Sequence, residues 1–360
     1  MPPPPENRPT LLKVARAAGV SLTAASMALR NHPRIGADTR RRVQATAKKL
    51  GYKPDPHLSR LMLYLRANKA VKYQETIGFL SDNARLEEWR GYSQADYYLG
   101  AADRANELGY RVEIFHLRMP GVTSASLNRV LRSRGIRGLL VSAFREPNAS
   151  LELDWPHFAT VACGYSLSRP RVDHTSTNYY RAMLMVTERL AAEGSRRVGL
   201  CLKASDDAKV LHLWQSAFLY FQHQLPAKLR LPIHEISEKE GNLRTWLRVT
   251  HPDSIISAGC DFPQIYDRTA GRAAPTGIRY VNMNIHHADA RSLGVDQDSY
   301  LVGRQACSHL VALLHRNELG LPEHPQITFT EFRWVEDWHE WHRAWQQRNT
   351  RLSAVISGCA

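Results

Sequence analysis

The sequence predicts an N-terminal all-α helix-turn-helix domain with a hinge helix, followed by an α/β core of two doubly wound parallel-sheet subdomains. Apolar residues at helical spacing surround a glycine within the first 31 residues, which indicates two short helices joined by a turn. From about residue 75, apolar β-rich runs alternate with helical stretches. Because 360 residues exceed one comfortable core, we expect two similar α/β units after the helical domain.

Composition narrows the class of protein. With 43% hydrophobic and 23% charged residues, the chain resembles ordinary soluble proteins. It has no apolar run of about 18 residues, and its start lacks the apolar core of a signal peptide. We therefore expect a cytoplasmic protein with no membrane partner. The five cysteines form no CxxC pair and no zinc-ligand spacing, which predicts buried reduced thiols.

The common catalytic and cofactor motifs are missing from the sequence. There is no Walker phosphate loop, no GxGxxG after a strand and no GxSxG elbow. The stretch His339-Glu340-Trp341-His342 differs from HExxH and has no third ligand nearby in the sequence. We expect no catalytic residues, no cofactor and no metal, and the protein is not predicted to be an enzyme.

The N-terminal residues carry the helix-turn-helix pattern. After a proline-rich stretch, for which residues 1–9 are expected to be a disordered tail, Leu11, Val14 and Ala18 fall on one helical face. Gly19 tolerates the left-handed conformation that ends a helix, and Ser21 can cap a second one. Two such helices fit DNA recognition, in which the second helix enters the major groove, but a plain helical hairpin fits the same spacing.

The charge distribution favours DNA binding over a plain helical hairpin. Residues 1–72 contain 15 Lys and Arg against three acidic residues, a net charge of +12 out of +14 for the whole chain. Such a concentration of cations suits a partner with regularly spaced phosphates, because each neutralised phosphate releases counterions. A basic face that is simply solvated remains the alternative.

A third helix and a linker complete the predicted N-terminal region. Residues 37–51 form a helix in which Val43, Ala47 and Leu50 are expected to pack on the first two helices. Asp55 is a plausible N-cap of a following short helix, which would be marginal alone in water. The predicted boundaries are 10–53 for the helix-turn-helix domain and 54–74 for the hinge helix and linker.

The α/β core is expected over residues 75–345, with a C-terminal tail over 346–360. Predicted strands cover 76–80, 111–115, 138–143, 159–163, 197–202, 233–236, 254–258, 279–283 and 327–329. Predicted helices cover 94–108, 125–134, 179–193, 209–224, 243–249 and 300–317. Alternation of this kind places helices on both faces of parallel sheets and a cleft at the carboxyl ends of the strands.

Residues at fixed offsets carry a family resemblance. They include Thr10-Leu11, Val14-Ala15, Ala18-Gly19-Val20-Ser21, Leu50-Gly51-Tyr52 and, in the core, Val295-Asp296-Gln297 with Gly303. With these residues the chain resembles the LacI/GalR family of transcriptional regulators. The resemblance implies a homodimer with a hinge helix, a core like the type I periplasmic sugar-binding proteins, and control by a small-molecule effector.

The resemblance implies a set of DNA-binding residues. Leu22, Thr23 and Met27 are expected to read base edges, with more apolar contact to thymine methyls than in many relatives. The phosphate contacts are expected from the ends of the helices, and a leucine of the hinge helix is expected to wedge into the minor groove. The complete expected set is Thr10, Ser21, Leu22, Thr23, Ser26, Met27, Arg30, Asn31, Tyr52 and Leu61.

Polar and aromatic residues near strand ends are the candidate effector contacts, although each could equally be structural. They are Ser81, Asp82, Trp89, Phe144, Tyr165, Asn178, Lys209, Trp214, Asp261 and Asn284. Aromatic faces beside amides and carboxylates suit a carbohydrate or a derivative. Because Asn284 stands where the family usually has Asp, and Lys209 or Val210 near its usual Arg, we expect an effector other than a standard monosaccharide.

The predicted function is therefore a sequence-specific DNA-binding regulator, expected to be a repressor, that binds a pseudo-palindromic double-stranded operator as a homodimer. Its expected effector is a carbohydrate or derivative. The alternative is a cytoplasmic sugar-binding protein or sugar-acting enzyme whose basic N-terminal arm serves only for interaction.

Overall fold

The computed structural model describes residues 11–29, 31–52, 75–85, 88, 93–236 and 243–357. The predicted disordered tail, the hinge helix with Leu61, and the candidate residues Thr10, Arg30 and Trp89 lie outside the described residues.

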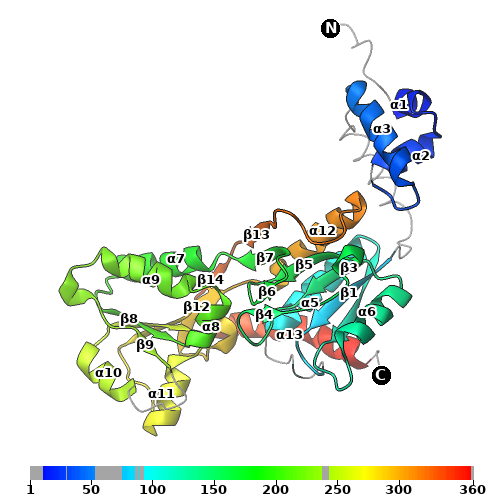
Figure 1. Ribbon diagram of the computed structural model, residues 1–360. Helices are drawn as coiled ribbons and strands as arrows, with labels where there is room; N and C mark the ends of the chain where they lie inside the picture. Colours follow the sequence, from blue (N-terminus) through cyan, green and yellow to red (C-terminus); the bar gives the residue numbers. More distant parts are fainter. Residues whose placement is uncertain are drawn as a thin grey trace.

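Three helices form the N-terminal domain, drawn in blue in Figure 1: α1 Leu11–Ala17, α2 Leu22–Leu29 and α3 Ala37–Lys49. Gly19 has φ +63° in the turn between α1 and α2, which confirms the predicted turn position. Val43 and Ala47 of α3 are buried against the first two helices. Leu50 is 38% exposed, so the prediction that it packs into this core is wrong: it follows α3, where the chain turns away.

The first sheet has six strands, all parallel, in the order β13-β7-β5-β3-β1-β2. Their bounds are β1 Glu75–Ser81, β2 Tyr110–His116, β3 Gly138–Val141, β5 Ala159–Cys163, β7 Asp173–Thr177 and β13 Ile327–Thr330. Alternate residues of β1 enter different cores because side chains alternate across a strand. Ile77 and Phe79 pack with α5 Ser93–Glu107 and α12 Ser299–Arg316, whereas Leu80 packs with α6 Ser124–Ser133.

Two glycines allow α5 and α12 to pack in close contact. A Cβ atom on Gly100 would lie 1.9 Å from the carbonyl oxygen of Tyr300, and one on Gly303 would lie 2.0 Å from that of Tyr97. Any larger residue at either position would collide with backbone of the facing helix. This crossing joins helices that are about 200 residues apart in the sequence.

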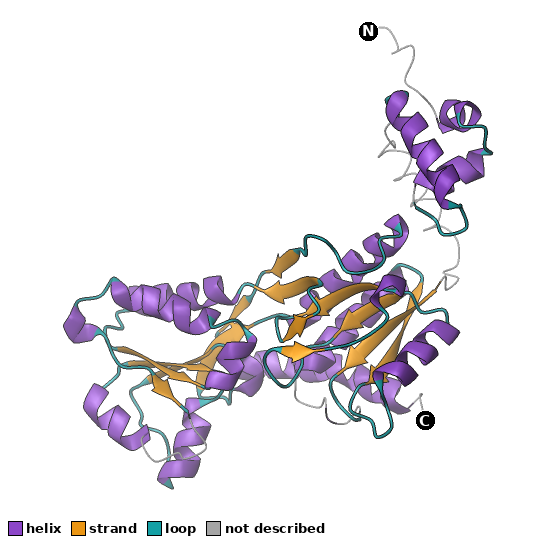
Figure 2. Cartoon of the chain, in the orientation of Figure 1, coloured by secondary structure: helices purple, strands orange, loops and turns teal. Residues whose placement is uncertain are grey.

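The second sheet has the order β14-β12-β11-β10-β8-β9, with only β14 antiparallel. Its strands are β8 Val198–Leu202, β9 His234–Glu235, β10 Ser254–Ala258, β11 Arg279–Asn282, β12 Ser292–Asp296 and β14 Arg333–Val335. One face carries α7 Tyr179–Ala192 and α9 Leu213–His223, and the other carries α10 Leu243–Thr250 and α11 Phe262–Ala270. Figure 2 shows the strands of each subdomain between two layers of helices.

The chain crosses between the subdomains three times, after β7, after β12 and between β13 and β14. The smaller elements are β4 Ala149–Ser150, η2 Trp155–His157, β6 Leu167–Arg169, α8 Ala204–Lys209, η3 Ala227–Leu229 and η4 Ile285–His287. A final helix, α13 Trp338–Ser357, lies below the first subdomain in Figure 1 and contacts α5.

The structure corrects several element predictions. The helix expected over 209–224 begins only at Leu213, as α9, because Leu211 and His212 have φ values of 56° and 57°, which a right-handed helix does not allow. The separate helix α8 ends at Lys209, where the expected helix would have begun. Strands β7 and β12 and helices α11 and α13 were not predicted. The boundary expected between residues 345 and 346 falls inside α13, so the described part of the expected tail is helical.

Candidate functional site

Helix α2 presents a mixed polar and apolar face. The Oγ of Ser21 accepts a hydrogen bond from the backbone N of Ala24 at 3.1 Å, which caps the start of the helix as predicted. Ala25 and Ala28 are buried, so small side chains hold α2 against α1 and α3. The other side of α2 carries Leu22, 48% exposed, exposed Thr23, and half-buried Ser26 and Met27.

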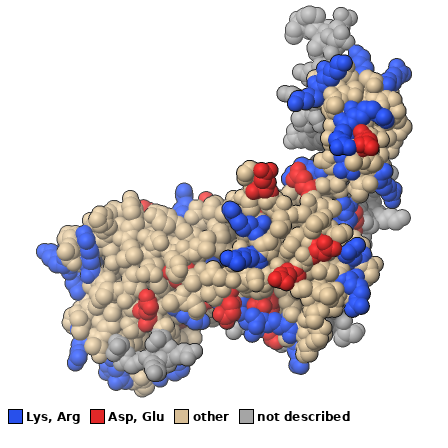
Figure 3. All heavy atoms as spheres, viewed as in Figure 1, with Lys and Arg blue, Asp and Glu red and all other residues tan. Residues whose placement is uncertain are grey.

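The N-terminal domain carries an excess of exposed cations. Within residues 11–29 and 31–52, seven Lys and Arg are exposed, namely Lys13, Arg16, Arg34, Arg41, Arg42, Lys48 and Lys49. Asp38, the acidic residue of this described part, pairs with Arg41 at 2.5 Å. Figure 3 shows several blue patches on the domain, which is otherwise mostly tan. Such a surface attracts phosphates in a salt-dependent way.

Two expected DNA contacts have other partners. The Oδ1 of Asn31 accepts a hydrogen bond from Nε2 of Gln44 at 2.7 Å. Tyr52 is half-buried against the core of the domain, and its backbone N donates to the carbonyl of Ala47 at 2.9 Å. Both residues therefore stabilise the helical domain in this structure.

A cavity of about 780 Å³ lies between the two subdomains. Five of the expected effector residues line it: Phe144, Tyr165, Lys209, Trp214 and Asn284. Aromatic rings form a continuous cluster on this wall, with the rings of Tyr179 and Trp214 at 5.6 Å and those of Tyr165 and Tyr179 at 6.3 Å. A volume of this size is typical of small-molecule sites.

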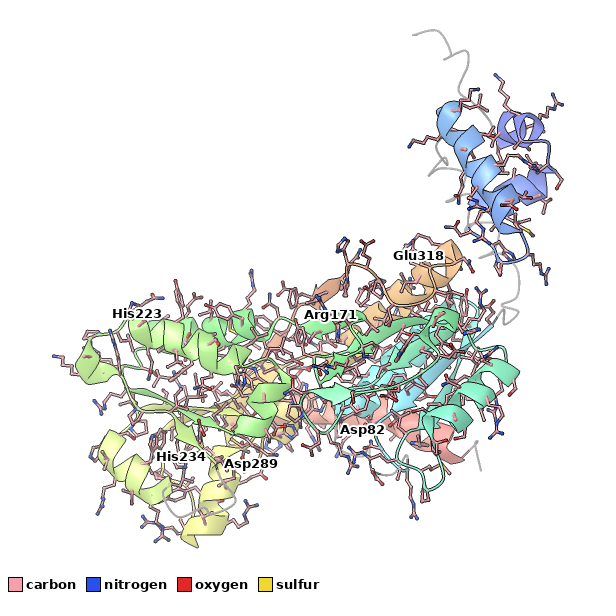
Figure 4. The ribbon with its side chains drawn as sticks, in the orientation of Figure 1. Asp82, Arg171, His223, His234, Asp289 and Glu318 are labelled. Carbon is pink, nitrogen blue, oxygen red and sulfur yellow. The ribbon has the colours of Figure 1, made fainter. Side chains whose placement is uncertain are left out.

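Four expected effector residues lie near strand ends but do not line the cavity. Asp82, labelled in Figure 4, binds Nε of Arg118 at 2.7 Å and the backbone N of Arg145 at 2.8 Å. Ser81 Oγ accepts from the backbone N of Asn83 at 3.3 Å.

The other two side chains cap helices. Asn178 accepts from the backbone N of Arg181 at 3.1 Å and begins α7. Asp261 begins α11 and also accepts from Asn282 and Ser292, each at 3.1 Å, and burial raises its pKa to about 6. Both residues lie near strand ends as expected, but their side chains cap helices and do not line the cavity.

The cavity also contains residues that the sequence reasoning missed. They include Gln94, Tyr97, Arg145, Lys203, Asp206, His287 and Gln297. Lys203 and Asp206 follow β8 directly, so the same strand-end reasoning that gave Phe144 could have found them. Gln94 and Tyr97 lie on α5, where no strand end marks them.

Ion pairs set the electrostatics of the cavity. Asp206 accepts from Nζ of Lys209 at 2.6 Å and lies 3.1 Å from Nζ of Lys203. Burial alone would raise the pKa of Asp206, but the two ammonium groups outweigh it and hold that pKa below its usual value. Across the cavity, the guanidinium of Arg145 pairs with Glu88.

Helix α13 connects both subdomains behind the cavity. Nε1 of Trp345 donates to Asp96 of α5 at 3.0 Å, and Nε1 of Trp341 donates to Asp296 of β12 at 2.9 Å. The ring of His286 packs edge-on against that of Trp341 at 4.9 Å. Burial raises the pKa of Asp96 to about 6 and lowers that of His286 to about 4.

Two kinds of feature are absent from the described residues. No group of three or more His, Cys, Asp and Glu is arranged to hold a metal ion there. No helix among the same residues is long and apolar enough to span a membrane.

Comparison with known proteins identifies the N-terminal domain. The family described as "Bacterial regulatory proteins, lacI family" matches residues 10–55, which are the segment of α1, α2 and α3. This segment of the chain is therefore similar to the DNA-binding domain of the lacI family.

Curated transcriptional regulators are similar over parts of the chain. The HTH-type transcriptional regulator MalR of Staphylococcus xylosus is 30% identical over 101 residues, which are 28% of each protein. The matches cover only 28% to 30% of the curated relatives' own lengths.

Solved structures show the same fold over most of the chain. A complex of the transcriptional regulator CelR with cellobiose has a TM-score of 0.53 at 20% identity, covering 92% of this chain and 99% of that one. A lac repressor dimer bound to operator and the anti-inducer ONPF has a TM-score of 0.50 at 17% identity, covering 91% and 98%. The predicted fold class, a helix-turn-helix domain followed by a two-subdomain core like the periplasmic binding proteins, is confirmed.

Proposed function

We propose that this chain is a LacI-family sequence-specific transcriptional repressor that binds a pseudo-palindromic operator as a dimer and responds to a carbohydrate or a derivative in its cleft. Two features of one chain carry the proposal. The N-terminal domain has an exposed face on α2 and seven exposed cations, and a cavity of about 780 Å³ is lined by residues of both subdomains. The CelR complex with cellobiose and the operator-bound lac repressor dimer support the combination by similarity.

The recognition helix supplies the sequence specificity. Leu22, Thr23 and Met27 read base edges in the major groove, and apolar contacts of Leu22 and Met27 favour thymine methyls. Ser21 and Ser26, with Thr10 and Arg30, position the helix on phosphates. Because a dimer presents two α2 helices, the operator has two half-sites about one helical turn or a multiple of it apart.

The domain organisation of the proposed repressor follows the predicted boundaries at its N-terminal end, with DNA binding in 10–53 and the hinge in 54–74. Effector binding and dimerisation belong to the core that begins at residue 75 and includes α13. Leu61 of each hinge wedges into the minor groove at the dyad, which unstacks a base step at a cost of about a few kcal/mol. Operator binding and hinge formation are then one equilibrium.

Effector control follows because the cavity walls belong to different subdomains. A ligand that favours one relation of the subdomains changes the separation of the hinges and hence operator affinity. By linkage, operator binding changes effector affinity by the same factor, and such couplings are typically about 1–3 kcal/mol.

Selection of bound duplexes from a random DNA pool, at two salt concentrations and with the full-length protein, tests the proposal. We expect a palindrome whose affinity falls with salt while its sequence preference persists. Recovery of no preferred sequence, with binding that disappears as salt rises, would reduce the N-terminal domain to a nonspecific basic arm.

A further inference from the structure

We propose that the effector is a sugar that carries an anionic group, a carboxylate or a phosphate, and that Lys203 and Lys209 bind this group. The inference rests on the proposed function only in treating the ligand as an effector. The cavity, its charges and its aromatic wall stand independently of DNA binding.

The charges that line the cavity do not balance. Its lining includes three cations, Arg145, Lys203 and Lys209, and two carboxylates, Glu88 and Asp206. The guanidinium of Arg145 pairs with Glu88 and also donates to Oδ1 of Asn83 at 3.0 Å. The two lysines share the carboxylate of Asp206, so one positive charge of this wall is uncompensated.

The two ammonium groups are close enough to act on one anion. They lie 3.1 Å and 2.6 Å from different oxygens of Asp206, so that carboxylate sets their separation. An ammonium group has three donors, and the bond to Asp206 uses one of each lysine's. Their side chains retain exposures of 50% for Lys203 and 25% for Lys209, on a wall of the cavity. Hydrogen bonds to an ionised acceptor are about twice as strong as neutral ones, so a ligand anion gains more here than a hydroxyl.

The surroundings of this wall are consistent with a surplus of positive charge. His287 lines the cavity beside the lysines, and burial, His286 and both lysines lower its pKa to about 4 although Asp206 opposes them. The imidazole is therefore neutral at pH 7 and adds no cation. It remains available as a hydrogen-bond partner for a ligand hydroxyl.

The rest of the cavity suits a polyhydroxylated ring. Trp214 is 4% exposed, and its Nε1 has no hydrogen-bond partner among the described residues. The same holds for Oε1 of Gln94 on the opposite subdomain. Both side chains line the cavity, and a small shift of either one lets a ligand hydroxyl accept from the indole or donate to the amide, while the faces of Tyr165 and Phe144 contact C–H surfaces. One ligand with an anionic group and several hydroxyls would thus find partners on both walls of the cavity.

The test measures thermal unfolding and binding heat of the full-length protein with defined probes at fixed ionic strength. The probes are glucose, galactose, gluconate, glucuronate, galacturonate, glucose 6-phosphate and inorganic phosphate. We expect saturable stabilisation by at least one anionic probe, with an affinity at least tenfold above that for its neutral parent. The carboxylate and phosphate arms distinguish the two sources of negative charge.

Variants of the cavity locate the binding. Lys203→Gln and Lys209→Gln should each lower the affinity for the anionic probe about tenfold, while Lys228→Gln, an exposed lysine on η3, should not change it. Asp206→Asn removes the carboxylate that competes with the anionic probe for the two lysines. This variant should therefore bind the anionic probe severalfold more tightly, whereas the lysine variants bind it more weakly. The unliganded melting temperature of each variant reports whether it folds.

Several outcomes overturn the inference: no stabilisation by any anionic probe, equal affinity for the neutral parent, or unchanged affinity in both lysine variants. Failure of the proposed function is distinguishable. A palindromic operator without anion binding rejects the inference alone, whereas anion binding without sequence-selective DNA binding rejects the repressor and leaves the ligand site standing.

Discussion

Replacement of Asp96 by asparagine should stabilise the protein at neutral pH. Asp96 is 2% exposed, accepts hydrogen bonds from Trp345 at 3.0 Å and Asn349 at 3.4 Å, and lies 3.4 Å from Nε2 of His286. Burial raises its pKa from 3.8 to about 6, although Arg348 and Trp345 act in the opposite direction. An asparagine carbonyl can still accept from Trp345, and the buried charge is removed.

The structure sets the size of the effect. A pKa difference of one corresponds to about 1.36 kcal/mol, so ionised Asp96 costs the folded state up to about 3 kcal/mol at pH 7. The hydrogen bond from Trp345 to the ionised carboxylate is already included in this pKa, because it opposes the rise caused by burial. The expected net gain in the free energy of unfolding for Asp96→Asn is therefore about 2–3 kcal/mol at pH 7.

The gain should depend on pH. Between its unfolded and folded pKa values, Asp96 binds more protons in the folded state, so its destabilising effect develops as the pH rises from about 4 through 6. His286 acts in the opposite sense: its pKa is lowered to about 4, so stability is lost as the pH falls from 6.5 towards 4. In the Asp96→Asn variant, only His286 of this pair still contributes to the pH dependence of stability. The difference from the unsubstituted protein should vanish near pH 4, and the variant should lose more stability on acidification.

Urea unfolding followed by tryptophan fluorescence, at pH 7, 5.5 and 4, measures these differences. Asp38→Asn is the matched control, since the Asp38 side chain is 94% exposed and pairs with Arg41 at the surface. Its substitution should change stability by less than about 0.5 kcal/mol at every pH. A midpoint for Asp96→Asn below that of the unsubstituted protein at pH 7 would refute the reasoning, because the ionised carboxylate would then be the favoured partner of α13.

Three further predictions concern packing and DNA binding. Gly303→Ala should lower the free energy of unfolding by about 3 kcal/mol, because the new Cβ atom would lie 2.0 Å from the carbonyl oxygen of Tyr97. Gly36→Ala is the control: its Cβ atom would meet no atom within 4 Å, so this variant should unfold near the temperature of the unsubstituted protein in calorimetry. Equal melting temperatures for both variants would contradict the close helix crossing. Leu22→Ala should weaken binding to the selected operator about tenfold in fluorescence anisotropy without lowering the melting temperature, and unchanged affinity would remove Leu22 from base reading. Leu61→Ala should keep the dimer, as judged by ultracentrifugation, and lose about tenfold or more in operator affinity; an unaltered titration would exclude the minor-groove wedge.

The sequence predicted those elements whose buried residues recur with the period of a strand or a helix. Strand β1 and helix α5 have apolar positions that alternate or recur at helical spacing, and both were predicted within one residue of their observed ends. Strand β7 has the sequence Asp-His-Thr-Ser-Thr, yet it is buried within the first sheet. Asp173 accepts from the backbone N of Gln326 at 2.9 Å and lies 2.9 Å from His309, so partners distant in sequence make the polar strand possible. The local sequence of a strand does not indicate partners that lie far away along the chain.

Some candidate effector residues line the cavity and others do not, for a related reason. Strand order predicts which residues reach the cleft end of a sheet, and on that basis Phe144 and Tyr165 were placed correctly beside the cavity. The direction of each side chain depends on whether a nearby helix needs a cap, as with Asp261 and Asn178. Helix α13 escaped prediction because the partners of its tryptophans, Asp96 and Asp296, lie on distant elements.

The contact between α5 and α12 determines the order in which the polypeptide can acquire its structure during synthesis. The strands from β8 to β12 are continuous in sequence, so this part of the second sheet is complete once residue 296 has left the ribosome. The first sheet lacks the helix that covers one face, and its edge strand β13, until residue 330 has been added. Ile77 and Phe79 therefore remain without the α12 side of their core while more than 200 further residues are translated, although β1 is made first. The earlier half of the core is the later one to mature, and during that interval it is the part of the chain that a chaperone would recognise.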